Sequence, residues 1–425
     1  MGLDSKSAGN LALMRVGIDV RCLQFAGGRR GTGRLVHNLI RGLVALGSDA
    51  QYVLLYFKEL PFPERLQQFC PPCEVAGIEG ATQLEATYPW YQCHPRLRTM
   101  GPLVDAHWRS YYKNHAQAFA DAVRREKLDL VHVTAPFDPN LPPASDCPVK
   151  TVYTFLDAIP LVFPDRYYRA WPVVVRRLYD LQKSAFVTAT RVVAISDCSR
   201  DDAVRLYGIN PERATRVYAA LEPDVDRPVS PESISAVRSK FHLGHRYFSF
   251  CSMADFHKGN DSLIAALTLV RERSEYPFQL AFLGVQPPRV HVLVREQCFD
   301  AGLNGRDVVV TGFVSDDEMD ALFKGSVALV SPSRYEGFGY PAAQAMAMGV
   351  PVIASDKSSL PEVVGDAGIL IDPESPESIA DAMLRLAGDE TLCQELVARG
   401  RERAKMFDCE KLAHEMWEVY RTTLA

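Results

Sequence analysis

A glutamate and a lysine stand where the neighbouring residues favour anion chemistry. Glu336 opens the stretch Glu336-Gly-Phe-Gly-Tyr-Pro341, between an apolar run and an Ala- and Met-rich helical stretch. A proline suits the first turn of a helix. A glycine turn before a helix N-terminus favours anions, because free backbone N–H groups and the helix dipole face the loop. Glu336 there is able to accept hydrogen bonds from hydroxyls, so phosphate and hydroxyls together suggest a sugar nucleotide.

The lysine, Lys258, follows a second apolar run in the sequence Asp255-Phe-His-Lys-Gly-Asn260. At a strand-to-helix junction, a lysine is able to pair with a phosphate and stabilise a departing diphosphate. Plainer interpretations exist for both residues. The sequence around Lys258 also fits a solvated surface lysine without a ligand, and Glu336 would also serve as a simple helix cap.

Two further turns follow predicted strands. Gly27 and Gly28 lie in a glycine-rich turn after the first strand and before a helix, where a backbone approaches a diphosphate closely. The spacing is not the dinucleotide fingerprint, and a turn without a ligand explains the same letters. Thr311-Gly-Phe-Val314-Ser could present backbone groups to a nucleobase, but an ordinary capped turn before Asp316 is the preferred interpretation.

The basic and aromatic segment 165–183 is a candidate for contact with a lipid-linked acceptor at a membrane surface. Pro172 interrupts any long amphipathic helix there. A role in an acceptor loop or in packing fits the segment as well.

Apolar runs alternate with amphipathic stretches along the chain, the pattern of parallel sheets with crossover helices. The predicted strands of the first half are 16–20, 52–56, 128–133, 150–155 and 191–196, and those of the second half are 247–253, 279–283, 308–311, 327–331, 351–354 and 369–371. The proline-rich stretch 222–231 between them reads as a linker. We therefore expect an α/β protein with two doubly wound domains that face each other across a cleft, with ligands beyond the carboxyl ends of the strands.

Composition limits the class of protein. The 425 residues are 47% hydrophobic and 23% charged, which is ordinary for a globular chain of two domains. No run of about 18 apolar residues occurs, so no transmembrane span is predicted. Residues 1–14 read as a loose leader, and a cytoplasmic location is expected, with possible peripheral contact at the inner face of the membrane. The net charge is −5, with the basic excess in the first half, which hints at an anionic surface or acceptor there.

The ten cysteines are scattered, as buried free thiols are. Cys70 and Cys73, followed by Cys93 and His94, could be drawn as a zinc site. The spacing of the second pair does not suit one, so no metal is predicted.

Four stretches together resemble the large retaining glycosyltransferase family that uses nucleotide sugars on the GT-B fold, of the family 4 type that includes bacterial mannosyltransferases. They are Lys258-Gly-Asn, Thr311-Gly-Phe-Val-Ser, Pro332-Ser-Arg-Tyr-Glu-Gly-Phe-Gly-Tyr-Pro and Ser359-Leu-Pro-Glu-Val-Val-Gly-Asp-Ala-Gly. The match is dense over 246–420 and thinner in the first half, where Asp157-Ala-Ile-Pro carries part of it.

The resemblance implies roles for these residues. Lys258 would contact the donor diphosphate and Glu336 the transferred sugar, with Asp157 as a further catalytic residue and no cofactor or metal required. The implied donor-binding residues are Gly27, Gly28, Met253, Lys258, Val314, Glu336, Gly337, Phe338, Gly339, Tyr340, Pro341 and Gln344. The implied domains are 15–225 for the acceptor, 226–405 for the GDP- or UDP-linked donor, and 406–425 as a helix that packs back on the first domain.

Three departures from the family pattern concern the donor. The second glutamate of the family is Gln344 here, and a neutral amide binds a hydroxyl more weakly than a carboxylate. An arginine five residues before the lysine is Met253, and the histidine of a His-Asp pair is Leu156.

The expected activity is transfer of a sugar, with retention of configuration, to a glycan or lipid-linked acceptor hydroxyl. Mannose from GDP-mannose is the preferred donor. The departures leave two alternatives, a weakened relative that supports a partner enzyme and a nucleotide-sugar epimerase.

Overall fold

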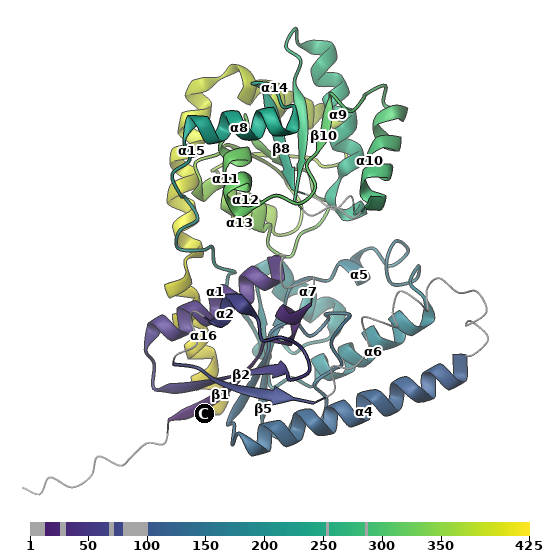
Figure 1. Cartoon of the computed structure of the whole chain (residues 1–425), viewed down its shortest axis with the longest axis vertical. Coiled ribbons are helices and arrows are strands. Elements are labelled where there is room, and N and C mark those ends of the chain that lie inside the picture. The colour runs from purple at the N-terminus through teal and green to yellow at the C-terminus, as the bar shows by residue number, and fades with distance from the viewer. Residues whose placement is uncertain (1–12, 26–30, 68–71, 80–100, 252–254, 285–287) are drawn as a thin grey trace, which may run out of the picture. The chain divides into compact units, whose positions relative to one another are not determined.

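The structure is a computed structural model of the chain, and it describes residues 13–25, 31–67, 72–79, 101–251, 255–284 and 288–425 (Figure 1). Contacts divide the chain into two compact units. Unit 1 takes Met1–Thr154, Pro172–Val193 and Ala413–Ala425, and unit 2 takes Phe155–Trp171 and Ala194–Leu412. These units interleave along the chain, and the division predicted near residue 225 stays a prediction.

The first sheet has the strand order β3-β2-β1-β4-β5-β6-β7. Strand β1 pairs in parallel with β2 and β4, β2 with β3, and β4 with β5. Its central strands are buried apolar runs, as a parallel sheet covered on both faces requires. The strands are β1 Met14–Asp19, β2 Ala50–Phe57, β3 Glu74–Ile78, β4 Leu130–Val133, β5 Lys150–Phe155, β6 Arg191–Ala194 and β7 Ala214–Arg216.

Helices connect these strands. They are α1 Gly31–Leu46, α2 Glu64–Gln67, α4 Gly101–Arg125, α5 Ile159–Val162, α6 Val173–Val187 and α7 Asp197–Tyr207, with short 3-10 turns η1 Arg21–Gln24 and η4 Pro211–Arg213. The last helix, α16 Cys409–Leu424, reaches unit 1 with its final turns, where the Tyr420 hydroxyl lies 2.7 Å from Nδ1 of His132 on β4. Both residues are fully buried.

The second sheet, in unit 2, has the order β10-β9-β8-β11-β12-β13, and its neighbouring strands are parallel. The order reverses direction between β8 and β11, and ligands of open α/β sheets bind beside such a point. The strands are β8 Tyr247–Cys251, β9 Gln279–Leu283, β10 Val308–Val310, β11 Leu329–Ser331, β12 Val352–Ser355 and β13 Ile369–Ile371.

A core of apolar side chains from these strands and from α9 and α14 holds unit 2 together, with Phe248, Phe250 and Phe282 fully buried. The helices that follow β7 in the chain, up to α16, are α8 Pro231–Phe241, α9 Asn260–Arg273, α10 Pro288–Asp300, α11 Asp316–Lys324, α12 Tyr340–Ala347, α13 Leu360–Val364, α14 Pro376–Gly388 and α15 Glu390–Ala404, with the turns η5 Phe256–Lys258 and η6 Lys405–Phe407.

The predicted fold class, two α/β domains with parallel sheets, is confirmed. Two edge strands, β3 and β7, are absent from the sequence prediction. Strand β3 is half exposed and carries Glu74 and Gly77, while β7 is the three-residue Ala-Thr-Arg, so neither shows a clear apolar pattern.

Candidate functional site

Glu336 lies in the loop between β11 and α12, at the carboxyl end of a central strand of unit 2. Gly339 takes the left-handed backbone conformation (φ 91°) that turns the chain into α12, and Pro341 stands in its first turn. The backbone of Glu336 is held from both sides: its N–H donates to Ser358 Oγ at 2.8 Å, and Ser359 Oγ donates to its carbonyl at 2.9 Å.

Lys258 reaches the same place from the turn after β8. Its Nζ donates to Glu336 Oε1 at 2.7 Å, and Ser333 Oγ donates to the same oxygen at 2.7 Å. Glu336 therefore does not serve as the simple helix cap that the sequence allowed. The side chains of Lys258 and Glu336 are 20% and 12% exposed, so the pair is largely shielded yet still reachable.

The charges of this pair support each other. Burial alone would raise the pKa of Glu336, but the Lys258 ammonium outweighs it and holds that pKa below its usual range. Burial would lower the pKa of Lys258, but the Glu336 carboxylate outweighs it and raises that pKa. Both groups therefore remain ionised around neutral pH.

Asp157, just after β5, lies close enough to this pair for the charges of both Glu336 and Lys258 to shift its pKa. Burial and then the Glu336 charge raise its pKa to about 6, against the opposing effects of the Ile159 N–H and Lys258. Its Oδ1 accepts the backbone N–H of Ile159 at 3.1 Å. Asp157 thus binds the first residue of the short helix α5 and also stands beside Glu336 and Lys258, so the three predicted catalytic residues come together within unit 2.

Gly337 lets the loop approach the chain at Leu156. A Cβ on this glycine would lie 2.0 Å from the Leu156 carbonyl oxygen, a distance no side chain tolerates. Ser199 Oγ donates to that carbonyl at 2.9 Å and to the Gly337 carbonyl at 3.0 Å. Only glycine fits here, because the close approach leaves no room for a methyl group.

The turn before α12 has the features of an anion site. In the part of the chain that the structure describes, no protein acceptor engages the backbone N–H of Gly337, Phe338 or Gly339. These groups lie at the positive end of the α12 dipole, beside Lys258. A phosphate there would meet N–H donors, a helix dipole and an ammonium together.

The other residues predicted for the donor site differ in how far they are buried. Phe338 packs edge-on against Phe407 and is buried, so its side chain serves the core. Gln344 is buried on α12, and Tyr340 and Pro341 are partly exposed at its start. Gly27, Gly28 and Met253 lie outside the described residues.

Val314 is buried in a small cluster beneath α11, and the adjacent Ser315 forms a capping box with Glu318. The capped turn preferred from the sequence is therefore confirmed.

A contact between a histidine and a tyrosine beside the pair was not predicted from the sequence. The Tyr167 hydroxyl lies 2.7 Å from His257 Nδ1 and accepts the backbone N–H of His257 at 3.3 Å. Burial, and then the Lys258 charge, lower the pKa of His257 to about 4, so this imidazole is neutral at pH 7. The signal available was the aromatic segment 165–183, but its partner could not be read from spacing.

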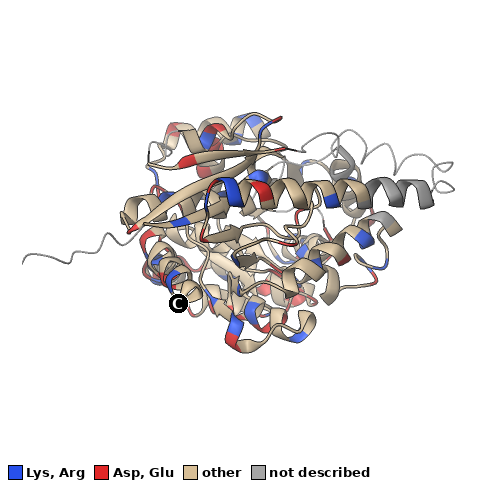
Figure 2. Cartoon of the chain, turned by 90° about the horizontal axis from the view of Figure 1, so that it is seen from below, with Lys and Arg blue, Asp and Glu red and all other residues tan. Residues whose placement is uncertain are grey.

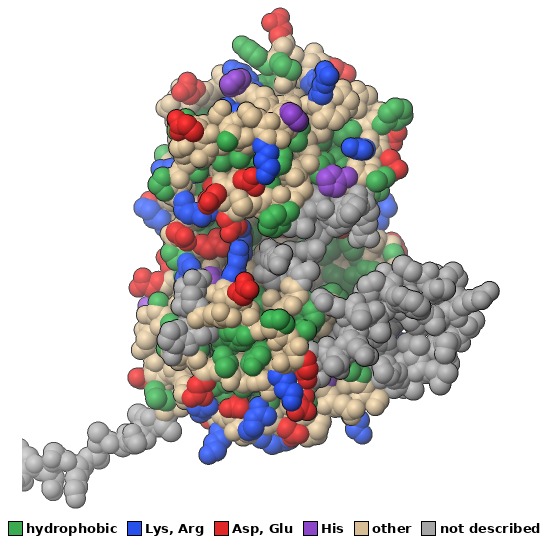
Figure 3. Space-filling model, viewed as in Figure 1, with side chains coloured by type: hydrophobic (Ala, Val, Ile, Leu, Met, Phe, Trp, Pro, Cys, Tyr) green, Lys and Arg blue, Asp and Glu red, His purple; other side chains and the backbone are tan. Residues whose placement is uncertain are grey.

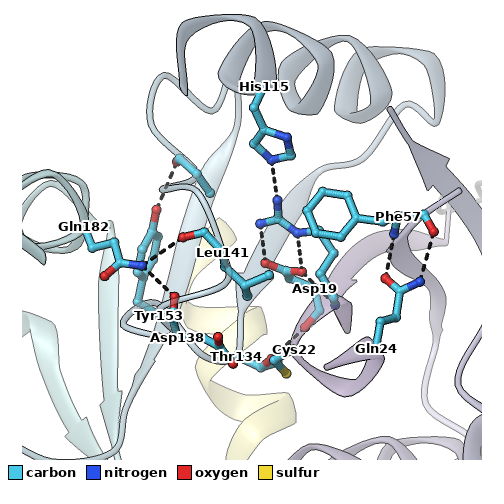
Figure 4. Close-up of polar contacts among 12 residues, drawn as sticks. Asp19, Cys22, Gln24, Phe57, His115, Thr134, Asp138, Leu141, Tyr153 and Gln182 are labelled. Atoms are coloured by element: carbon cyan, nitrogen blue, oxygen red, sulfur yellow. Dashed lines mark hydrogen bonds and ion pairs between the residues drawn. The ribbon is translucent and has the colours of Figure 1, made fainter. Parts of the chain in front are cut away.

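A second buried ion pair lies in unit 1, directly after β1 (Figure 4). Arg21 donates through Nε to Asp19 Oδ1 at 2.8 Å and through Nη2 to Oδ2 at 2.7 Å, and both side chains are 1% exposed. His115 of α4 contacts the same guanidinium through Nε2, as the dashed line in Figure 4 shows. The ring of Phe119 lies 4.8 Å from the guanidinium carbon. This pair is closed off from solvent.

Charged and hydrophobic residues are mixed in the views drawn in Figures 2 and 3. In Figure 2 basic and acidic residues alternate along the elements of unit 1, and in Figure 3 hydrophobic side chains are scattered among polar ones on the face drawn. No helix in the described ranges is long and apolar enough to cross a membrane. No group of three His, Cys, Asp or Glu side chains suited to a metal occurs there either. Cys73 is a free thiol, while Cys70, Cys93 and His94 lie outside the described residues.

Two family models match the chain. Residues 29–225 match the model described as Glycosyltransferase Family 4, and residues 245–389 match the one described as Glycosyl transferases group 1. Among similar proteins, the serotype-specific mannosyltransferase WbdA of Escherichia coli is 29% identical over 321 residues. That match takes 73% of this chain but only 38% of WbdA. The O-antigen chain mannosyltransferase B of Escherichia coli is 30% identical over 235 residues, 55% of this chain and 61% of that protein.

Solved structures share the fold at low identity. The sucrose-phosphate synthase of Thermosynechococcus elongatus superimposes with a TM-score of 0.71 at 18% identity, over 96% of this chain and 98% of that one. HepE of Anabaena, solved with UDP and glucose, gives a TM-score of 0.69 at 18% identity, over 96% and 100%. From the matched models and the shared fold, the chain belongs to the family 4 type of glycosyltransferases and has the two-domain GT-B fold.

Proposed function

We propose that this protein transfers a sugar from a nucleotide donor to an acceptor hydroxyl, with retention of the anomeric configuration. The observation that carries the proposal is the Lys258–Glu336 pair at the start of α12, beside three backbone N–H groups that no acceptor engages among the described residues. Lys258 and the backbone N–H groups suit a diphosphate, and Glu336 suits a sugar hydroxyl. When the donor binds, its phosphate groups pair with Lys258 and its sugar hydroxyls bond to Glu336, in place of the ion pair between these two residues.

In the proposed reaction the bond from the sugar C1 to the acceptor oxygen forms as the bond from C1 to the diphosphate oxygen breaks. The acceptor proton passes to the departing phosphate oxygen on the same face of the sugar. Lys258 and the N–H groups of the turn stabilise the negative charge that develops on the diphosphate. Glu336 orients the sugar through its hydroxyls, and Asp157 stands beside it.

The preferred donor is GDP-mannose and the preferred acceptor a glycan or a lipid-linked sugar. Two of the similar proteins are named as mannosyltransferases, which supports mannose. HepE was solved with UDP, so a UDP-linked sugar is the competing donor. The match spans only 38% of WbdA, so the substrates of that protein enter here as proposals for this chain.

A thermal-shift screen identifies the donor. GDP-mannose, GDP, UDP-glucose, UDP-N-acetylglucosamine and UDP are tested one at a time. A ligand at 100 times its Kd stabilises the folded protein by about 2.7 kcal/mol and so raises its Tm. We expect the largest rise with GDP-mannose; no rise with any of the five would contradict the proposed donor class.

Variants then test the site with the donor that the screen selects. Lys258→Ala and Glu336→Ala are each expected to lower kcat/KM for transfer or donor hydrolysis by roughly 100-fold or more, the usual loss when a charge-stabilising donor is removed. Lys357→Ala, which removes an exposed lysine paired to Asp356, serves as the control. Near-normal turnover in either site variant would disprove the assignment.

A second candidate is a non-catalytic relative that supports a partner enzyme. Leu156 and Gln344, which replace a histidine and a glutamate of the family pattern, favour it. Transfer or donor hydrolysis by the purified chain alone, lost in Lys258→Ala, excludes this candidate.

A further inference from the structure

Arg334 lies in the same loop as Glu336, two residues before it, yet its side chain turns away toward the loop that carries Lys258. The side chain is 8% exposed. The guanidinium packs 4.5 Å over the ring of Phe256. A long charged side chain is buried at this depth only when its hydrogen bonds are satisfied.

The contacts of Arg334 join the two loops directly. Nη1 and Nη2 form a fork with Asp261 Oδ1 and Oδ2 at 2.8 and 2.9 Å. Nη1 also donates to the Phe256 carbonyl at 2.9 Å, and the backbone N–H of Arg334 donates to the His257 carbonyl at 2.7 Å. The residues on either side of Lys258 are therefore bound to one arginine.

A second carboxylate partner, Glu374, completes the arrangement. Nε donates to Glu374 Oε1 at 2.6 Å and Nη2 to Oε2 at 3.2 Å, so two acidic side chains surround one guanidinium. Partial burial would raise the pKa of Asp261, but the hydrogen bonds and charge of Arg334 outweigh it and hold that pKa low. With its donors used in this way, Arg334 has little left for a phosphate, and its role is structural support of the site.

The loops that it joins are packed as closely as backbone allows. A Cβ at Gly259 would lie 2.2 Å from the Pro332 carbonyl oxygen, and Gly259 has a φ of 72°. Lys258 and Glu336 meet because these two backbones touch at Gly259 and are tied together by Arg334. A lysine at position 334 has no planar fork and could not hold Asp261, Glu374 and the Phe256 carbonyl at once.

We infer that Arg334 is a positioning residue of the proposed donor site: it fixes the spacing between Lys258 and Glu336, so that one nucleoside diphosphate sugar engages both. This inference rests on the proposed function. A displacement of about 1 Å in a reacting group can lower a rate about 100-fold, and loss of a supporting contact typically costs 10- to 100-fold in affinity or activity.

The test compares Arg334→Gln with Arg273→Gln. Arg273 pairs with Asp381 at 2.8 Å in the same unit, but both side chains are exposed, which makes it a matched control for the loss of an arginine charge. Binding of GDP and of UDP is measured by calorimetry, and KM and kcat are measured with the donor that binds. Arg334→Lys is the second variant, which keeps the charge if Arg334→Gln does not fold.

We expect Arg334→Gln to weaken binding of the preferred nucleotide and raise KM for the donor by roughly 10-fold or more, with Arg334→Lys intermediate and Arg273→Gln unchanged. Amide hydrogen exchange should become faster in 256–262 in Arg334→Gln and stay unchanged in Arg273→Gln.

The outcomes separate the two proposals. If the wild-type chain binds the nucleotide and Arg334→Gln binds it within twofold, the inference is wrong and the proposed function stands. Unchanged exchange in 256–262 would also overturn the inference, because the loops would not depend on Arg334. If the wild-type chain binds neither GDP nor UDP, the proposed donor fails, and this role for Arg334 fails with it.

Discussion

The two units each hold an ion pair after the first strand of a sheet, and the two pairs differ in what surrounds them. Arg21 in unit 1 is closed in by Asp19, His115 and aromatic rings, with 1% of its side chain exposed (Figure 4). Lys258 in unit 2 has one carboxylate partner and is 20% exposed. A charge that is buried against its partners within the protein serves stability, whereas a charge with a reachable partner is available to a ligand.

Each pair also has a neighbour with a shifted pKa, and the two pKa values are shifted in opposite directions. Burial, and then the charge of Arg21, lower the pKa of His115 to about 2, so it is a neutral acceptor for the guanidinium. Burial and the Glu336 charge raise the pKa of Asp157 to about 6. The first shift keeps His115 neutral within a closed cluster at pH 7, and the second leaves a carboxyl group that titrates near the working pH of most enzymes.

The largest expected effect is on the closed pair. Arg21→Ala leaves the Asp19 carboxylate buried without its fork, and breaking a buried pair in this way costs about 3 to 5 kcal/mol. Urea denaturation measures the loss, with Arg124→Ala as the control, because the Arg124–Asp121 pair is exposed and such pairs contribute about 0 to 1 kcal/mol. A cost below about 1 kcal/mol for Arg21→Ala would remove the contrast between the two pairs.

A smaller effect is expected from Asp157. Its folded pKa of about 6 lies above the usual 3.8, so between pH 4 and 6 the folded protein holds a proton that the unfolded chain has released. Stability from this group is therefore present below pH 4 and falls as the pH rises to 6. Asp157→Asn should remove this dependence on pH. The difference in the free energy of unfolding between the variant and wild type should therefore favour the variant more at pH 7 than at pH 4, by on the order of 1 kcal/mol, allowing for solvent screening.

Urea denaturation of Asp157→Asn and wild type at pH 4, 5, 6 and 7 checks this expectation. Asp165→Asn, which removes an exposed carboxylate paired to Arg169, is the control. A difference in stability that does not change with pH would show that Asp157 does not titrate in this window.

The smallest stability effect is expected for Lys258→Ala. Glu336 would keep its hydrogen bond from Ser333 and is partly reachable by water, so the free energy of unfolding should fall by about 1 kcal/mol or less. Together with the large loss of transfer expected for this variant, that result would separate function from stability at one residue. A loss as large as that of Arg21→Ala would mean that the Lys258–Glu336 pair is structural as well.

The apolar runs predicted most of the fold because buried parallel strands are nearly continuous in hydrophobic residues. Strand β8, Tyr-Phe-Ser-Phe-Cys, is one example, and it lies within the predicted 247–253 run. The edge strands β3 and β7 have no such signal, since their backbone pairing is decided by a neighbouring strand and not by their own side chains.

The candidate site was predictable in part. Glu336, Lys258 and the glycine turn were identified because each carries its own local chemistry next to a strand end. Tyr167 with His257, Ser358 with Glu336, and the tie through Arg334 were not, because the partners are far apart in sequence and meet only in the folded chain.

The sequence by itself determined the α/β class, the order of its strands along the chain and the residues able to bind phosphate and hydroxyls, since these follow from local periodicity and side-chain chemistry. The tertiary structure decided which charges are closed in and which remain reachable. Arg21 and Lys258 are both basic residues beyond a first strand, and nothing in their near neighbours distinguishes a buried fork from an open pair. That distinction depends on α4 covering one and on a second loop, held by Arg334, meeting the other.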